Sequence, residues 1–520
     1  MNSIRQRVLG GIFLGLLFSL SACSSPTQTA QSDAILKLNI GANPSFLNPV
    51  LMTDSASSSV VGLVFDGLFK RNEDLDMEKE LVKSYSVSKD GLTYTFRLRK
   101  GVKWHDGHPF TAEDVNYTFD VLLDPKTNTV RRGHFIINGN PIIFKVIDTH
   151  TIQATLPQPF APFIATLDMG ILPKHLLEGK DINTADFNRH PIGTGPFIFK
   201  DWKSGQFVTL KKNPHYFKGA PKLDGILMKI IPDPNTALMA LQKNELDAAG
   251  IPAKDVPKIE KISYLDIYKY SRLNYSYIGL NVKKPPFDNL ILRQAIDHAI
   301  NKPAIIKSIL KGYGEVAYIP SHPLSWAYPK SSDLVKHDYN PQTSETLIQS
   351  LGYKRHIKTN IYEKEGVPLS FTLIIAQGSP ETQKMAQIIQ QYLITSGIKM
   401  RIQVMEWSAF LKVIHSHQDP KPFDAVLLGW GFDITDPDDA YTSWHSSQYP
   451  KGGNFNGYQS AKADRLLEKG RVTISQKKRK KIYTEFFQTI GTDTPYIFLF
   501  HPQSITGIHK RVKGLSKPGP

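Results

Sequence analysis

Residues 91–125 read GLTYTFRLRKGVKWHDGHPFTAEDVNYTFDVLLDP, and this stretch carries the clearest structural signals in the chain. Its first part, residues 92–98, alternates apolar and polar side chains and is rich in Thr, Tyr and Phe, which predicts a strand. Thr111 and Asp114 stand three residues apart before an apolar run, which is the spacing of a capping box, so we expect a helix that Thr111 caps. The stretch therefore predicts a strand, a turn and a helix in succession.

His105 and Asp106, in the turn of the same stretch, are the residues that a catalytic interpretation would use. Such a pair needs a nucleophile or further metal ligands at a matching spacing, and none accompanies it in the sequence. The chain also contains no G-x-S-x-G, no H-E-x-x-H and no Walker-type loop. We therefore expect the stretch to be structural, and we predict no catalytic residue.

The second half of the chain alternates strand and helix signals. Residues 370–375 and 399–405 are strand-like, and between them Ser379-Pro380 offers an N-cap followed by proline at the first helical position. The helix stops at Gly397 and carries one apolar face, made of Met385, Ile388, Ile389, Tyr392 and Leu393. A strand–helix–strand unit of this kind implies parallel pairing, and hence an α/β domain.

The rest of the body fits the same class. Residues 423–429 predict another strand, whereas residues 193–251 are richer in Pro and Gly and predict short strands and turns, with one helix at 234–242. With 520 residues, of which 41% are hydrophobic, the chain is long and apolar enough for about three domain-sized units. We predict an α/β body of at least two lobes.

The formal net charge of +16 raises the question of a nucleic-acid partner. The positive residues are spread along the chain, and the densest run, KKRKK at 477–481, falls in an expected helix. We interpret this run as a solvated helix face, with a nucleic-acid arm as the alternative. The sequence therefore predicts no nucleic-acid partner.

The first residues have the layout of an export signal. Two arginines precede an apolar stretch at 8–20, which is short for a membrane span, and small residues follow it. Leu20-Ser21-Ala22-Cys23 resembles a bacterial lipoprotein box, in which the cysteine is acylated; a free cysteine after an ordinary signal is the alternative. We predict a signal peptide at 1–22, a lipidated flexible tether at 23–33, and a periplasmic or cell-surface location in which Cys23 anchors the chain to a membrane.

Beyond this physical interpretation, residues 91–125 resemble the signature segment of the solute-binding proteins that serve bacterial ABC importers. This is the family of dipeptide, oligopeptide and nickel receptors (family 5). Further similarities follow in the family's order, from about Asp33 to the end: Gly67-Leu68, PIGTGPF at 191–197, NPHY at 213–216, RQAIDHAI at 293–300, EWSAF at 406–410, and Gly429-Trp430 leading to DPD at 436–438. The length and number of these segments make the resemblance specific.

The resemblance implies a fold and a function. The fold is α/β, a two-lobed clam of the periplasmic-binding-protein type with an extra subdomain in the first lobe. The expected parts are residues 34–67, 196–275 and 491–520 for the first lobe, 68–195 for the extra subdomain, and 276–490 for the second lobe. Members of the family capture peptides between the lobes and deliver them to membrane permease subunits, and we expect this chain to do so as a monomer without a cofactor or metal.

Two other functions stay open at this point. One is a receptor on the same fold for a nickel chelate, haem or an oligosaccharide. The other is a secreted hydrolase that uses the acidic run from Asp433 to Asp439. A single run does not place carboxylates on opposite walls of a site, and it lacks the glycine-centred pattern of a calcium loop, so we expect no enzyme.

The resemblance also implies which residues meet the ligand. The family pairs a peptide's α-ammonium with an aspartate three residues after the tryptophan of the Gly-Trp segment, which is Asp433 here; a loop-capping role is the alternative. Glycines on both sides of that tryptophan let an extended ligand approach the backbone as an added strand. Two tryptophans are expected to wall side-chain pockets, although Trp407 has a core position as its alternative. The expected site consists of Asp433, Gly429, Trp430, Gly431, Trp407 and the loop Thr53-Asp54-Ser55.

The chain departs from the family where a cation often receives the peptide carboxylate. One such position is the loop after the strand at 370–375, which reads AQGS at 376–379; the other is Ile414, seven residues beyond Trp407. Neither is basic, and His415 and Lys412 are the substitutes that neighbouring turns offer. A longer peptide whose end reaches water and a non-peptide ligand both stay open.

Overall fold

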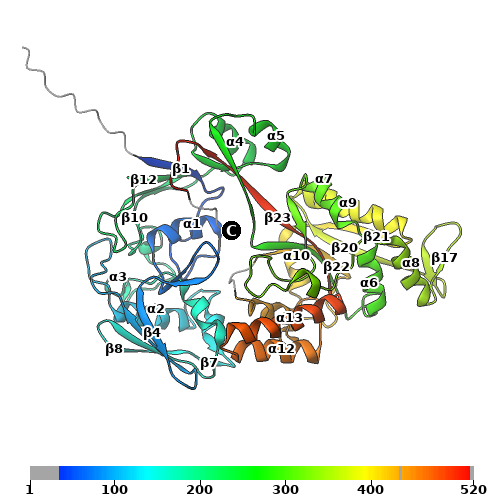
Figure 1. The fold of residues 1–520 in the computed structure, drawn as a ribbon, viewed down its shortest axis with the longest axis horizontal. Coiled ribbons are helices and arrows are strands. Elements are labelled where there is room, and N and C mark those ends of the chain that lie inside the picture. Colours follow the sequence, from blue (N-terminus) through cyan, green and yellow to red (C-terminus); the bar gives the residue numbers. More distant parts are fainter. Residues whose placement is uncertain (1–33, 432–435, 516–520) are drawn as a thin grey trace, which may run out of the picture.

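The computed structural model describes residues 34–431 and 436–515. The expected signal peptide, Cys23 and Asp433 lie outside the described residues. Within the described part, no helix is long and apolar enough to cross a membrane. This part folds into two lobes that share one β-sheet (Figure 1).

The shared sheet has twelve strands, and the long strand β23 (Tyr496–His509) joins its two halves. The second half of β23 pairs with strands of the first lobe: β14 (Leu265–Ser271) and β13 (Ala248–Gly250), followed outward by β1 (Ile35–Asn39), β12 (Gly225–Lys229), β11 (Phe207–Lys212) and β10 (Phe197–Lys203). The first half pairs with strands of the second lobe: β16 (Gly314–Val316) and β15 (Asn274–Leu280), followed by β22 (Ala425–Gly431), β20 (Ser370–Ala376) and β21 (Lys399–Met405). The lobes are therefore joined through β23 and through the short link between β14 and β15.

The first lobe packs two sheets around a hydrophobic core that runs from Leu47 to Met228. Its second sheet has the order β4 (Val82–Val87), β5 (Thr93–Leu98), β9 (Thr151–Thr155) and β8 (Ile143–Asp148). The elements that matter for the site are α1 (Ser55–Val64), β2 (Phe69–Arg71), β3 (Met77–Lys79), α2 (Ala112–Leu123), and the 3-10 helices η1 (Arg132–Phe135) and η2 (Ala161–Asp168). The predicted helix at 234–242 is confirmed as α4 (Pro234–Gln242).

The stretch at 91–125 forms the strand and helix that its pattern predicts. Residues 93–98 are β5, and Thr111 caps α2 through a capping box in which Asp114 Oδ2 accepts from Thr111 N at 2.9 Å. His105 is buried between main-chain groups: its Nδ1 accepts from Gly193 N at 3.2 Å, and its Nε2 lies 2.9 Å from Gly195 O. Burial lowers the pKa of His105 to about 4, so the ring stays neutral as a structural link.

The glycines at 193 and 195 let this link reach α1. A Cβ atom on Gly193 would stand 1.8 Å from Val64 O, and one on Gly195 would stand 2.7 Å from Leu63 O. Gly195 N also donates to Val64 O at 2.9 Å. The family-like segment at 191–197 therefore fixes the end of α1, and with it the wall on which the loop at 53–55 sits.

The second lobe has helices on both faces of its half of the sheet. Successive residues of each strand point to opposite faces, so β20 gives Leu373 and Ile375 to one core and Ile374 to the other. One face carries α6 (Leu290–His298), α7 (Lys302–Ile309), α8 (Pro341–Ser350) and α9 (Pro380–Thr395); the other carries α10 (Trp407–Ile414), α11 (Asp439–Trp444), α12 (Ala461–Val472) and α13 (Gln476–Asp493). The predicted strand–helix–strand unit is confirmed, because β20 pairs with β21 in parallel and α9 connects them.

Two expectations for this lobe need correction. The strand expected at 423–429 begins and ends two residues later, because its pairing with β15 continues to Gly431. The basic run at 477–481 lies in α13 as expected, but it is not solvated throughout: its lysines are exposed, whereas Arg479 is only 4% exposed. Arg479 is buried because a carboxylate of the same lobe, Asp436, pairs with it.

The lobes also touch away from the strands that join them. The guanidinium of Arg471 on α12 lies 5.2 Å from the ring centroid of Phe160 in the first lobe. The same group lies 3.8 Å from the ring of Tyr441 and donates from Nε to Asp438 Oδ2 at 3.1 Å. Arg471 therefore connects the first lobe to the acidic segment that follows β22. We propose the division into parts given above for these lobes, except that the first half of β23 lies with the second lobe, whose strands β15 and β16 it pairs with.

Candidate functional site

Helix α1 carries the loop that we expect to face the ligand. Asp54 is its N-cap: the carboxylate accepts from Ser57 N at 2.8 Å and from the Ser57 hydroxyl at 2.7 Å. The neighbouring side chains of Thr53 and Ser55 are exposed. Asp54 thus fixes the start of the helix, while the side chains of Thr53 and Ser55 stay exposed beside it.

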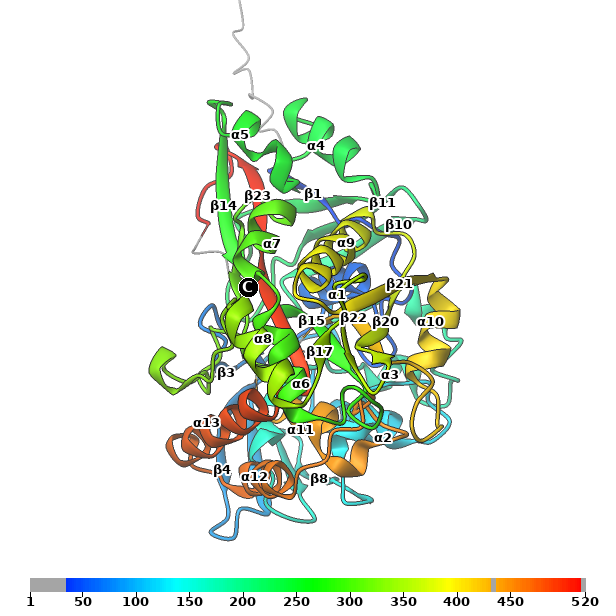
Figure 2. The same cartoon turned by 90° about the vertical axis from the view of Figure 1, so that its right-hand side faces the viewer.

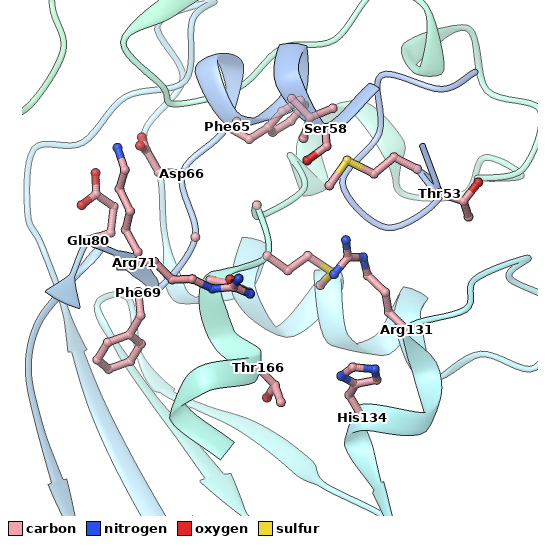
Figure 3. A pocket seen from close by; sticks show the side chains of 18 of the residues that line it. Thr53, Ser58, Phe65, Asp66, Phe69, Arg71, Glu80, Arg131, His134 and Thr166 are labelled. Carbon is pink, nitrogen blue, oxygen red and sulfur yellow. The ribbon is translucent and has the colours of Figure 1, made fainter. Parts of the chain in front are cut away.

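A cavity of about 760 Å³ opens beside α1 (Figure 3). It is lined by residues from α1, β2, η1, η2 and the turns next to them, all between positions 52 and 170. The loop at 53–55 lies in its wall. The other polar or charged lining residues are Ser58, Asp66, Lys70, Arg71, Glu80, Arg131, His134, Thr166 and Asp168.

Two buried carboxylates, Asp66 and Glu80, form one end of this cavity. Asp66 is 6% exposed and Glu80 is 1% exposed. The Tyr216 hydroxyl lies 3.1 Å from Asp66 Oδ1 and 3.0 Å from Glu80 Oε1, and Thr194 donates to Asp66 Oδ2 at 2.9 Å. One hydroxyl carries one proton, so the two short contacts of Tyr216 are both hydrogen bonds only when a carboxyl group supplies the second proton.

The electrostatics favour Asp66 as the holder of that proton. Burial, together with the nearby charge of Glu80, raises the pKa of Asp66 to about 7. Glu80 has a cationic partner of its own, since Lys218 forms an ion pair with it. At neutral pH this end of the cavity is therefore partly protonated, and it presents little free negative charge.

The second lobe presents the end of β22 to the space between the lobes. Gly429, Trp430 and Gly431 pair antiparallel with residues 274–276 of β15 on one side. On the other side, β20 pairs only with Ala425 and Val426. Among the described strands, none pairs with residues 427–431 on that side, so this edge of the backbone can take an added strand.

Three acids follow β22 in the chain, and the fold holds each of them. Asp436 pairs with Arg479, Asp438 pairs with Arg471, and Asp439 Oδ2 accepts from Trp430 Nε1 at 3.1 Å. Burial raises the pKa of Asp438 to about 7, against the opposing charge of Arg471. Each acid of the run after residue 435 therefore has a partner within the fold. The one other acid of the run is Asp433, which lies outside the described residues.

Trp407 does not occupy the core. It is the first residue of α10, is 51% exposed and stacks on Phe410 with ring centroids 5.7 Å apart. Neither Trp407 nor Trp430 lines the cavity beside α1.

Figure 1 shows α1 and β22 in different lobes at the same height, and Figure 2, turned by 90°, shows them superposed, so α1 lies opposite β22.

Of the expected residues, the structure thus places the loop at 53–55 on the cavity wall of the first lobe and Gly429–Gly431 on β22 of the second lobe, whereas Trp407 lies away from the cavity and Asp433 lies outside the described residues. Sequence reasoning missed the charged lining of the first wall, above all Arg71 and Arg131. Arg71 pairs with Asp168 at 2.7 Å across 97 positions of the chain, and no local pattern signals such a contact. The only sequence signal for Arg131 is that two arginines follow the helix of the 91–125 stretch.

The chain is similar to known proteins over nearly all of its length. The family model described as bacterial extracellular solute-binding proteins, family 5 middle, matches residues 76–452. The oligopeptide-binding protein AppA of Bacillus subtilis is 34% identical over 519 residues, covering 97% of this chain and 94% of that protein. Heme-binding protein A of Haemophilus influenzae is 28% identical, covering 95% and 94%.

Solved structures show the same fold. AppA of Bacillus subtilis in complex with a nonapeptide superposes with a TM-score of 0.76 at 34% identity, covering 92% of this chain and 95% of that one. NikZ of Campylobacter jejuni in complex with Ni(L-His) gives a TM-score of 0.78 at 31% identity, covering 93% and 95%. The similar proteins therefore include receptors solved with a peptide and with a metal chelate.

Proposed function

Because this chain belongs to family 5 of the bacterial extracellular solute-binding proteins, we propose that it is the peptide-capturing lipoprotein of an ABC importer. It binds a peptide between its lobes and delivers it to the membrane permease subunits. It acts as a monomer, and it does no chemistry on the peptide. Cys23 carries the lipid that holds it at the outer side of a membrane.

The observation that carries this proposal is the open edge at residues 427–431 of β22, opposite the cavity beside α1. A peptide in extended form can pair its main chain with such an edge, whatever its side chains are. A cavity of about 760 Å³ on the facing wall then leaves room for several side chains or for a chain end. This combination suits a ligand that has a repeating backbone.

Asp433 is proposed to bind the α-ammonium group at the start of the peptide. It follows Gly431 by two positions, which puts it next to the open edge along the chain. The other acids of the run have partners in the fold, as described above. A closed site leaves a charged chain end without water, so a carboxylate at this point offsets the cost of burying the ammonium.

Native mass spectrometry of the protein purified from its own host tests the proposal. The spectrum is expected to show bound species whose masses and fragments are those of peptides, and incubation should leave added peptides intact. A retained metal chelate, haem or sugar would assign the same fold to a different ligand. Cleavage of added peptides would instead make the protein a hydrolase.

A further inference from the structure

Arg131 and Arg71 are the two arginines that line the cavity, and only Arg71 has an ion pair among the described residues. The Nε atom of Arg131 is buried and has no hydrogen-bond partner among residues 34–431 and 436–515, and no carboxylate of those residues forms an ion pair with it. The side chain itself lines the cavity, and Figure 3 shows Arg71 and Arg131 projecting into it from opposite sides. A cationic nitrogen removed from water without a partner is unfavourable, and an anion is the partner that best compensates it.

The backbone around Arg131 is firmly held. Arg131 N donates to Thr129 Oγ1 at 3.1 Å, and Thr129 Oγ1 in turn donates to Val50 O at 2.7 Å. The next residue, Arg132, turns away and donates to the main-chain oxygens of Leu122 and Asp124 at the end of α2. The fold therefore uses one arginine of the pair as a structural brace and presents the other to the cavity.

The other arginine of the cavity already has a carboxylate partner, because Arg71 pairs with Asp168. The lysine of the cavity wall, Lys70, is near enough to Asp66 for its charge to lower the pKa of that carboxyl group. The two positions at which the family often places a cation for the ligand carboxylate are unsuited here. Ile414 is 4% exposed and packs in the core of the second lobe, and the loop at 376–379 contains no basic residue. Lys412 lies on α10 and His415 directly follows that helix, and neither residue lines the cavity.

We infer that Arg131 binds a carboxylate of the captured peptide, which it receives in the cavity beside α1. The inference rests on the proposed function and deepens it, since it gives the peptide a direction: its first residue at the end of β22, and a carboxylate in the first lobe. The carboxylate comes either from the C-terminus or from an acidic side chain. The planar guanidinium group of Arg131 donates two parallel hydrogen bonds, one to each oxygen of the carboxylate.

The test uses synthetic hexapeptide libraries and the full-length protein in detergent. One library contains no Asp or Glu and ends in a free carboxylate; the second has the same residues and ends in an amide; the third is the amide library with one Glu at random positions. Retention is measured by mass spectrometry for the wild type, for Arg131→Gln and for Lys126→Gln. Lys126 is a matched control because it is exposed, lies in the same segment and does not line the cavity.

The wild type and Lys126→Gln are expected to retain the free-acid library over the amide library by about tenfold to hundredfold, the usual effect of one charge-assisted hydrogen bond. Arg131→Gln should retain both alike, with an unchanged melting temperature. Recovery of retention with the Glu library would assign the carboxylate to a side chain. If Arg131→Gln keeps the wild-type preference, or if the wild type prefers neither the free-acid library nor the Glu library over the amide library, the inference is overturned. If the wild type retains no peptide from any library, the proposed function itself fails.

Discussion

Arg479 donates two hydrogen bonds to Asp436, from Nη1 to Oδ2 at 2.7 Å and from Nη2 to Oδ1 at 2.5 Å, inside the second lobe. Both side chains are nearly inaccessible to water, with 4% and 8% exposed. Asp436 is the first described residue after Asp433, so this pair fixes the chain close to the residue proposed to bind the peptide's ammonium group. The pair therefore links the stability of the lobe to the shape of the site.

Arg479→Met should lower the free energy of unfolding by about 3 to 5 kcal/mol, because it leaves the Asp436 carboxylate buried without its partner. Urea unfolding followed by fluorescence measures the loss. Lys478→Met, at an exposed neighbouring position of α13, is the control and should change the free energy by less than about 0.5 kcal/mol. Equal effects of the two variants would mean that the pair contributes nothing beyond the helix surface.

Asp66 predicts a pH dependence of stability. Its pKa in the folded protein is about 7 against an ordinary value of 3.8, because burial and the charge of Glu80 favour the neutral form. The folded state therefore holds a proton that the unfolded chain releases, and this contribution is complete below about pH 4 and lost as the pH rises through 7. Asp66→Asn stays neutral, so the free energy of unfolding that the wild type loses as the pH rises should be smaller in this variant by about 1 to 4 kcal/mol.

Urea unfolding at steps between pH 4 and pH 8 compares Asp66→Asn with the wild type. Asp76→Asn changes an exposed carboxylate of the same lobe, and it should follow the wild-type profile. If the free energy of unfolding of Asp66→Asn depends on pH in the same way as that of the wild type, Asp66 is ionised in the folded protein at all these pH values.

Gly193→Ala should displace α1. The added Cβ would stand 1.8 Å from Val64 O, which is main chain and cannot move aside alone, so we expect a loss of about 3 kcal/mol or more in stability and weaker ligand binding. Gly133→Ala is the control, because no atom lies within 4 Å of its Cβ position. Thermal unfolding distinguishes them, and similar melting temperatures would argue against a tight contact between residue 193 and α1.

These contacts show how far the sequence reaches. The signals that proved reliable are local: Thr111 with Asp114, and Ser379 followed by Pro380, make the helix N-termini that the sequence predicts. Arg479 was expected in water because its neighbours are lysines, and only the fold reveals that Asp436 lies 43 positions away in the same interior. The exposure of Arg131 to a cavity depends in the same way on how residues 52–170 fold together, which no spacing along the chain encodes.

Anchoring is tested by Cys23→Ser. We expect the wild type to incorporate labelled palmitate and to sediment with membranes, because the cysteine after Leu20-Ser21-Ala22 is acylated. The variant should carry no label and should stay in the exported fraction or remain unprocessed. Equal labelling of both proteins would exclude Cys23 as the lipidated residue.

The central claim is that the chain binds a peptide between its lobes with Asp433 on the peptide's ammonium group. Calorimetry decides it with the wild type and Asp433→Ala, each titrated with one peptide recovered from the purified protein and with its N-acetylated form. Asp433→Ala should weaken binding of the free peptide by about 2 to 5 kcal/mol, since it leaves a buried cation unpaired. Acetylation should weaken binding to the wild type and have far less effect on the variant. Additive losses from the mutation and the acetylation would mean that the two groups do not meet, and would contradict this account.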